Sequence, residues 1–150
     1  MDVVDQVSAI LQEKGRQIWT IAPAETVYDA LQIMASKEVG ALLVMEGERL
    51  VGILSERDYA RKIILKGRSS KETKVNEIMV SPPLTVPSDC SVERAMRLMT
   101  ESRVRHLPVT SPNGDIVGLV SIGDLVKWII TSQQETIQQL HSYISGGSGA

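Results

Sequence analysis

The sequence is poor in the features that mark several classes of protein. It contains no phenylalanine and only 3% aromatic residues, so it offers few surfaces on which single-stranded bases could stack. Its formal net charge of −2 lacks the strongly basic character of most nucleic-acid-binding domains. The single cysteine, Cys90, cannot form an internal disulfide and has no sequence neighbour that would activate a thiol. Nucleic acid is therefore not expected as a partner, and Cys90 is interpreted as structural.

Long apolar runs are also absent. No run approaches the roughly 20 residues that span a bilayer, and the first residues, with Asp2 and Asp5, do not resemble a secretory signal. We therefore expect a cytoplasmic protein without membrane contact. A chain of 150 residues, 43% hydrophobic and 23% charged, is long enough for one compact core or for two small units that share one.

Apolar periodicity predicts a short series of elements in the first half of the chain. A leader helix ends at Gly15, an extended stretch follows, and Thr26 caps the next helix. Two strands joined by a tight turn pair antiparallel, and Ser55 opens a further helix. The residues expected in these elements are 3–14, 18–21, 27–37, 39–45 with 50–54, and 55–67.

The second half of the chain copies the first. Thr85 matches Thr20 at an offset of 65, and Asp124 matches Asp58 at an offset of 66, because one turn in between is longer by a residue. A register that changes only in a turn is the signature of an internal duplication. The predicted fold class is α/β (α+β), with two β-α-β-β-α repeats packed about a pseudo-two-fold axis.

The segments outside the repeats carry separate expectations. The linker between the repeats is polar, but its residues 75–79 are apolar enough to dock on the fold. The leader and the last helix either pack only on their own chain or build a dimer contact. We divide the chain into a leader helix (1–15), repeat 1 (16–67), the linker (68–80), repeat 2 (81–130), an extended C-terminal helix (131–145) and a disordered Gly/Ser tail (146–150).

Each repeat contains a short apolar strand that runs into Ser-x-x-Asp at the start of a helix. The two copies are Ser55 with Asp58 and Ser121 with Asp124. The simplest interpretation is a helix cap, in which the hydroxyl accepts a hydrogen bond from a free backbone N–H group. Such a turn can also offer amide donors to an anion and a carboxylate to sugar hydroxyls. Duplication within a larger repeat favours a ligand-binding role in addition to capping.

These motifs, in this order, resemble a tandem pair of cystathionine-β-synthase (CBS) domains, also called a Bateman module, from about Trp19 to Ile130. The resemblance depends on the two Gly-h-x-Ser-x-x-Asp segments (h is apolar), the threonine that opens each repeat, the two Val-x-x-Ala-x-x-x-Met helices and the segment 103–109. Such families bind AMP, ADP or ATP in clefts between the repeats, and some members bind NAD or S-adenosylmethionine. The resemblance therefore implies a non-catalytic module that binds adenine nucleotides and needs no metal.

The resemblance also implies roles for individual residues. Asp58 and Asp124 would hold ribose hydroxyls, and Ser55 and Ser121 would contact ribose or phosphate. The family's two-fold axis would bring the basic residues of repeat 2 toward the pocket of repeat 1. The other candidates are the opening Thr20 and Thr85; Ile53, Leu54, Leu119 and Val120 around the base; Arg57 and Gly123 beside the aspartates; Arg103, Arg105 and His106 near the phosphates; and Gly40 and Ala41, which occupy the positions of Arg105 and His106 in repeat 1.

The two sites are expected to differ in affinity. Repeat 1 has the small residues Gly40 and Ala41 where repeat 2 has the basic pair Arg105 and His106. Each charge-assisted phosphate contact that is lost in this way contributes about 1.5 to 3 kcal/mol. Gly123 could partly compensate by letting backbone amides approach a phosphate. Arg103 and Arg105 could instead be solvent-facing charges on a strand, and His141 is interpreted as a surface residue.

The leading hypothesis is an energy-sensing regulatory module for signal transduction. It would act as a homodimer through its CBS faces and terminal helices, and would pass the nucleotide-bound state to an unknown effector protein. One alternative is a structural or RNA-binding adaptor with the same fold, which would show salt-sensitive RNA retention. The other is a small nucleotide-dependent enzyme, which is disfavoured because the sequence shows no nucleophile beside a base, no metal cluster and no Walker-type phosphate loop.

Overall fold

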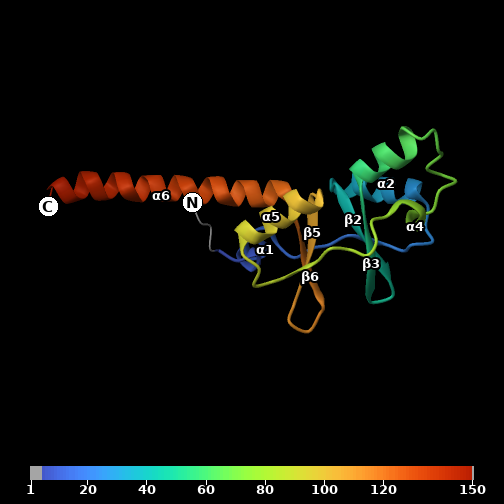
Figure 1. The fold of residues 1–150 in the computed structure, drawn as a ribbon, viewed down its shortest axis with the longest axis horizontal. Helices are drawn as coiled ribbons and strands as arrows, with labels where there is room; N and C mark the ends of the chain where they lie inside the picture. The colour runs from blue at the N-terminus through green and yellow to red at the C-terminus, as the bar shows by residue number, and fades with distance from the viewer. Residues whose placement is uncertain (1–4, 150) are drawn as a thin grey trace. The chain divides into compact units, whose positions relative to one another are not determined.

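The computed structural model describes residues 5–149, without the side chains of residue 143 and residues 145–149. The chain forms two units (Figure 1). The first-repeat unit is Gln17–Leu84, and the second-repeat unit joins the N-terminal segment up to Arg16 to the chain from Thr85 onward. Among the described residues, no helix combines the length and the apolar character needed to cross a membrane.

The first-repeat unit contains a three-stranded sheet in the order β1-β2-β3. The first two strands are parallel, and the second and third are antiparallel, as the sequence predicts for the hairpin. The elements are β1 (Thr20–Ile21), α2 (Val27–Lys37), β2 (Ala41–Glu46), β3 (Arg49–Ser55), α3 (Glu56–Tyr59), the π-helical turn η1 (Ala60–Ile64) and α4 (Val75–Ile78).

The second-repeat unit has the same topology, with strand order β4-β5-β6 and the same parallel and antiparallel pairings. This agreement confirms the duplicated mixed α/β fold. The elements are α1 (Val7–Lys14), β4 (Val86–Pro87), α5 (Val92–Ser102), β5 (His106–Thr110), β6 (Ile116–Ser121) and α6 (Ile122–Gly149).

The central strand of the first-repeat unit is buried on both faces over residues 41–44, as predicted from its continuous apolar run. In the first-repeat unit, Leu42, Val44 and Leu54 are fully buried and pack with the inner face of α2. Thr26 caps this helix as predicted, because its side chain accepts a hydrogen bond from the amide of Asp29 at 3.1 Å. These local signals fix the strand β3 whose end carries the first Ser-x-x-Asp motif.

The linker completes the first-repeat unit. Its Val75 and Ile78 are buried, so the expected docking of this segment is confirmed. The amide of Val75 donates to the Glu25 carbonyl at 2.8 Å, and the amide of Val27 donates to the Thr73 carbonyl at 2.9 Å. The linker is therefore exposed only in part.

The leader helix α1 plays the same part in the second-repeat unit. The amide of Val7 donates to the Cys90 carbonyl at 2.8 Å, and the amide of Val92 donates to the Asp5 carbonyl at 2.8 Å. Cys90 and Val92 lie 65 residues after Glu25 and Val27, so the two docking arrangements are equivalent. The N-terminal segment thus belongs in space to the second repeat, although it precedes the first repeat in sequence.

The main differences from the predicted element boundaries lie in three helical segments. The leader helix begins at Val7, and the first part of its predicted range lies outside the described residues. The helix opened by Ser55 changes into a π-helical turn after Tyr59. Helix α6 continues to Gly149, so the Gly/Ser segment expected to be disordered is helical up to that residue, because extending a helix costs less than nucleating one. Ala150 lies outside the described residues.

Candidate functional site

Ser55 ends β3 and caps α3, which places the first Ser-x-x-Asp motif at a strand-to-helix turn. The Ser55 side chain accepts a hydrogen bond from the amide of Asp58 at 3.3 Å. In return, Oδ2 of Asp58 accepts bonds from the amide and from the hydroxyl of Ser55, both at 2.9 Å. The capping interpretation is therefore confirmed for this motif.

The second motif repeats this geometry at the junction of β6 and α6. The amide of Asp124 donates to the hydroxyl of Ser121 at 3.1 Å, and the amide of Ser121 donates to Oδ2 of Asp124 at 2.8 Å. The duplication in the sequence thus becomes a duplication of side-chain geometry. Each repeat holds one carboxylate at the entrance to a helix.

Each motif aspartate has a lysine partner, and the two lysines come from different places. Lys62 places Nζ 3.3 Å from Oδ1 of Asp58 and donates to the Ile78 carbonyl at 2.7 Å. Lys14 of α1 places Nζ 2.6 Å from Oδ2 of Asp124 and donates to the Leu119 carbonyl at 3.0 Å. Neither lysine was predicted from the sequence as part of a site. The i,i+4 spacing could have revealed Lys62, whereas Lys14 lies 110 residues from its partner and gives no local signal.

The carboxyl group of Asp124 is kept ionised. Burial is the largest single influence and acts to raise its pKa, but the hydrogen bonds from Lys14 and Ser121 and the Lys14 charge together hold the pKa below its usual range. Within the described chain, its hydrogen bonds from Ser121 and Lys14 both fall on Oδ2. Oδ1 is therefore left to accept hydrogen bonds from a ligand.

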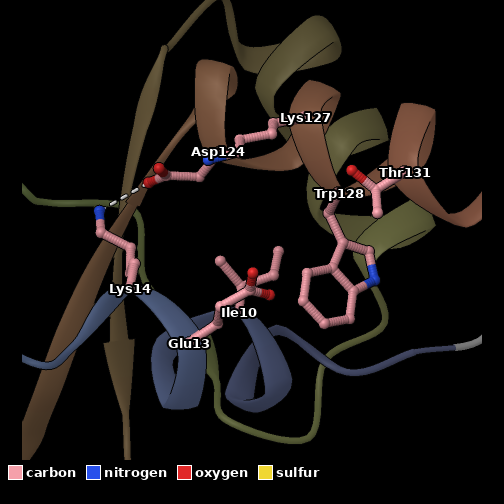
Figure 2. A pocket seen from close by; sticks show the side chains of 7 residues that line it. All are labelled: Ile10, Glu13, Lys14, Asp124, Lys127, Trp128 and Thr131. Atoms are coloured by element: carbon pink, nitrogen blue, oxygen red, sulfur yellow. Dashed lines mark hydrogen bonds and ion pairs between the residues drawn. The ribbon is translucent and has the colours of Figure 1, made fainter.

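A pocket of about 260 Å³ lies beside Asp124, between α1 and α6. Figure 2 shows the Lys14–Asp124 pair on one side of this pocket and the indole ring of Trp128 on the other. The indole N–H group donates to Oδ2 of Asp5 at 2.9 Å, which fixes the orientation of the ring. Of the residues that line the pocket, only Asp124 was predicted from the sequence. The lining consists of Ile10, Glu13, Lys14, Asp124, Lys127, Trp128 and Thr131.

The candidate residues at the start of β2 lie beside the first motif. Ala41 pairs with Ser55 across the hairpin, and the Gly40 carbonyl accepts a hydrogen bond from the amide of Glu56 at 3.0 Å. Arg57 lies in the first turn of α3 and is partly exposed. The structure therefore gathers these three candidates around one strand-to-helix turn.

The basic candidates near the start of β5 lie beside the second motif. His106 pairs with Ser121, and the Arg105 carbonyl accepts a hydrogen bond from the amide of Ile122 at 2.9 Å. Arg103 ends α5 in the left-handed conformation, with φ 55°, and is exposed. Gly123 lies in the first turn of α6 and is exposed. The backbone thus places Arg105 and His106 next to the motif of their own repeat.

The apolar candidates divide between the two faces of each sheet. Leu54 and Val120 are fully buried, and Leu54 belongs to the core beneath α2. Alternation along β3 and β6 turns their side chains to the face opposite that of Ile53 and Leu119. The expectation that these four positions surround the base stays a prediction. Leu119 remains partly exposed, whereas Ile53 is buried.

The opening threonines lie farther from the motifs along the sheets. Thr20 on β1 pairs with Leu43, and Leu43 pairs with Ile53 on β3. Two strand spacings of about 4.8 Å separate Thr20 from Ile53. Thr85 lies immediately before β4, and both threonines are exposed.

Comparison with known proteins agrees with this architecture. The CBS domain family model matches residues 7–65 and 75–131. The mitochondrial CBS domain-containing protein CBSX3 of Arabidopsis thaliana is 44% identical over 151 residues, which cover 94% of this chain and 72% of that protein. The chain spans 58% or less of the length of three further curated relatives.

Two solved structures show the same fold. A CBS-domain protein of Burkholderia ambifaria, named as a candidate signal-transduction protein, is 48% identical with a TM-score of 0.81, and the match covers 86% of this chain and 96% of that one. The protein PAE2072 of Pyrobaculum aerophilum, solved in complex with AMP, is 26% identical with a TM-score of 0.71, and the match covers 80% and 89%. The chain belongs to the CBS-domain family and carries two such domains in tandem.

Proposed function

We propose that this chain is a non-catalytic regulatory module that binds an adenine nucleotide, with AMP as the first candidate, at its Ser-x-x-Asp motifs. The observation that carries the proposal is the ionised carboxylate of Asp124, which keeps Oδ1 available beside a pocket that also contains ammonium groups. A ribose offers two adjacent hydroxyl donors, and an ionised carboxylate is acceptor-only and can take both.

The surroundings of Asp124 suit the remaining parts of a nucleotide. Lys14 and Lys127 line the pocket and supply positive charge for a phosphate, while Ile10 and Trp128 supply apolar surface for a base. The volume of about 260 Å³ lies just below the range of about 300 to 1,000 Å³ usual for ligand pockets. The pocket is therefore matched in size to the nucleoside portion of the ligand.

The motif of the first repeat is less accessible. Asp58 is only 9% exposed, and its two oxygens are engaged by Ser55 and by Lys62. A ribose must displace one of these partners before it can bind Asp58. We therefore infer that the two motifs differ in affinity and that the motif containing Asp124 binds more tightly.

The relatives support the ligand class and the regulatory role. PAE2072 was solved in complex with AMP, and the Burkholderia protein is named for signal transduction. ATP, NAD and S-adenosylmethionine carry the same adenosine group and are the further candidate ligands. The proposal includes a cytoplasmic energy-sensing homodimer, formed through the CBS faces and terminal helices, that reports the bound state to an effector protein. Nucleotide can shift its conformation only if the two conformations bind it unequally.

Isothermal titration calorimetry tests the nucleotide site. The full chain is titrated with AMP, ATP and NAD, and with GMP as the control for base recognition. We expect heat with AMP that fits one tighter and one weaker site, and weaker heat with GMP. The absence of heat with AMP, ATP and NAD would contradict the proposal. Equal affinity for AMP and GMP would show that the pocket holds a phosphosugar without recognising adenine.

A further inference from the structure

Helix α6 is longer than the packing of its unit requires. Leu125, near its N-terminal end, is fully buried, and this part of the helix packs on α5 and β6. Farther along, Ile137, Leu140 and Ile144 leave 64%, 57% and 67% of their surface exposed. Figure 1 shows this part of α6 continuing well beyond β5 and β6 of the same unit. Within the described chain, nothing covers these apolar side chains.

The exposed apolar residues of α6 recur with the spacing of a coiled coil. Val126 and Ile130 are also exposed. Together with Ile137, Leu140 and Ile144, and with the polar Gln133 between them, they recur at alternating intervals of four and three residues. Written as heptads abcdefg, the pattern has isoleucine at every a position. The a positions are Ile130, Ile137 and Ile144, and the d positions are Val126, Gln133 and Leu140.

The chemistry beside this stripe permits pairing of identical helices. The e and g positions from Ile129 to His141 carry no residue charged at neutral pH. Glu135 is the one acidic residue of this stretch, and it occupies an f position, which faces away from the stripe. From Ile129 onward, a second copy of the helix would therefore meet an apolar seam of the same pattern with no like charge beside it.

A membrane surface fits this helix less well than a protein does. Helices that lie on membranes are rich in lysine and arginine on their polar face. After Lys127, α6 has no lysine or arginine, and its polar face consists mainly of glutamine, serine and threonine. In a parallel coiled coil, β-branched residues at a with leucine at d favour two strands. Isoleucine at a and Leu140 at d match that rule.

We propose that residues 126–144 of α6 form a parallel two-stranded coiled coil with the same residues of a second copy of this chain. At about 1.5 Å per residue, the seam is roughly 27 Å long. Gln133 interrupts the apolar seam and favours the register in which the two glutamines face each other. The coiled coil rests on the homodimer of the proposed function, but it does not depend on nucleotide binding.

Sedimentation equilibrium with matched charge variants tests the seam. The full chain is compared with Ile137→Glu/Leu140→Glu, which places two carboxylates in the seam, and with Gln138→Glu/Gln139→Glu, which places two on the outer b and c positions. We expect the wild type and the outer variant to sediment as dimers with equal affinity. The seam variant should lose at least roughly 100-fold in dimer affinity. It should also lose helical circular dichroism signal, because an unpaired helix frays.

Disulfide cross-linking tests the parallel orientation. In a Cys90→Ser background, Ile144→Cys places thiols at facing a positions of a parallel pair, whereas Ser142→Cys places them on the outer f position. We expect a disulfide-linked dimer only for Ile144→Cys. An antiparallel pair would separate the two introduced thiols to opposite ends of the seam, so the absence of this cross-link would overturn the proposed geometry.

The remaining outcomes separate this proposal from the proposed function. If the wild type is a dimer, the seam variant keeps the same dimer affinity and Ile144→Cys forms no disulfide-linked dimer, the coiled coil is overturned and the homodimer stays in place. A monomeric wild type would overturn both. Binding to phosphatidylcholine vesicles by a monomeric wild type, lost in the seam variant, would assign the stripe to membranes instead. Calorimetry with AMP reports on the nucleotide site in every one of these cases.

Discussion

The ammonium group of Lys14 lies 2.6 Å from Oδ2 of Asp124. The leader helix therefore supplies the counter-ion for the motif carboxylate of the second repeat. In the first repeat, the corresponding carboxylate takes its lysine from the segment that directly follows its own motif. The duplicated motifs thus differ in which segment of the chain controls their charge.

Replacement of Lys14 by methionine should destabilise the protein in a pH-dependent way. The Lys14–Asp124 pair is partly exposed, with side-chain exposures of 38% and 24%, so we expect a loss of about 0.5 to 1 kcal/mol of unfolding free energy at pH 7. The folded-state pKa of Asp124 is lowered. The stabilisation is therefore fully present above the ordinary carboxyl pKa of about 3.9 and is lost as the pH falls through the lowered folded-state value.

Urea unfolding of Lys14→Met and wild type at pH 7 and at pH 3 measures this effect. The difference between the two proteins should be smaller at the lower pH. Lys127→Met removes the same charge from the same pocket without breaking an ion pair of Asp124, so it serves as the matched control. A difference that is equally large at both pH values would show that the Lys14 stem, and not its charge, stabilises α1.

The two aspartates should respond differently to replacement by asparagine. Asp124→Asn keeps the shape of the side chain but removes the charge that strengthens bonds from ribose hydroxyls, so AMP affinity at the tighter site should fall about 10- to 100-fold. Asp58 is almost fully buried in its cap and ion pair. Asp58→Asn should therefore mainly lower the melting temperature and leave the tighter site unchanged.

Calorimetric titration with AMP and thermal unfolding, performed on both variants, distinguish these effects. If Asp58→Asn removed the tighter site and Asp124→Asn left binding intact, the assignment of the tighter site to the second repeat would be wrong.

Local signals in the sequence were sufficient to predict the repeats. The threonine cap of α2, the hairpin and the Ser-x-x-Asp caps each depend on residues within a few positions of one another, and each was confirmed. The alternation that buries Leu54 was equally local. Its burial could therefore have been predicted, because in a strand covered on one face by a helix only one of two neighbouring residues faces a given side.

The contacts that give the second motif its electrostatics were not predictable. An apolar stripe on α1 shows that the helix packs, but it does not say which repeat receives it. Lys14 meets Asp124 only because α1 docks on the second-repeat unit. The pocket lining from Ile10 to Thr131 depends on the same docking. The sequence therefore indicated the carboxylate of the candidate site, but not its cation or its walls.

Glycine at the end of α2 should stabilise the protein. Glu38 follows α2 with φ 55°, in the left-handed region. This conformation costs a non-glycine residue about 1 to 2 kcal/mol, and glycine adopts it freely. Glu38→Gly should raise the unfolding free energy by about 0.5 to 1 kcal/mol after the greater flexibility of the unfolded chain is counted. Lys37→Gly, one residue earlier and inside the helix, should lower it by about 1 kcal/mol. Urea unfolding of both variants measures the contrast, and a loss of stability in both would exclude the left-handed cap.

Gly118 on β6 should not tolerate alanine, because of a neighbour on α1. A Cβ atom at this position would lie 2.7 Å from Cδ2 of Leu11, and Leu11 is buried and cannot easily move aside. Overpacking of this kind costs about 1 to 3 kcal/mol. Gly123→Ala is the matched control, because its Cβ would meet only the Ser121 hydroxyl at 3.6 Å, and alanine favours a helix by up to about 1 kcal/mol.

A double-mutant cycle identifies Leu11 as the cause. Leu11→Ala alone should destabilise the protein by about 2 to 5 kcal/mol through the cavity that it leaves. In that background, Gly118→Ala should cost little, because its methyl group enters the space vacated by the leucine. The sum of the losses in unfolding free energy of the two single variants should therefore exceed the loss of the double variant by about 1 to 3 kcal/mol. If the losses added without coupling, α1 would not dock on β6 as the structure describes. The Lys14–Asp124 pair, which depends on the same docking, would lose its basis.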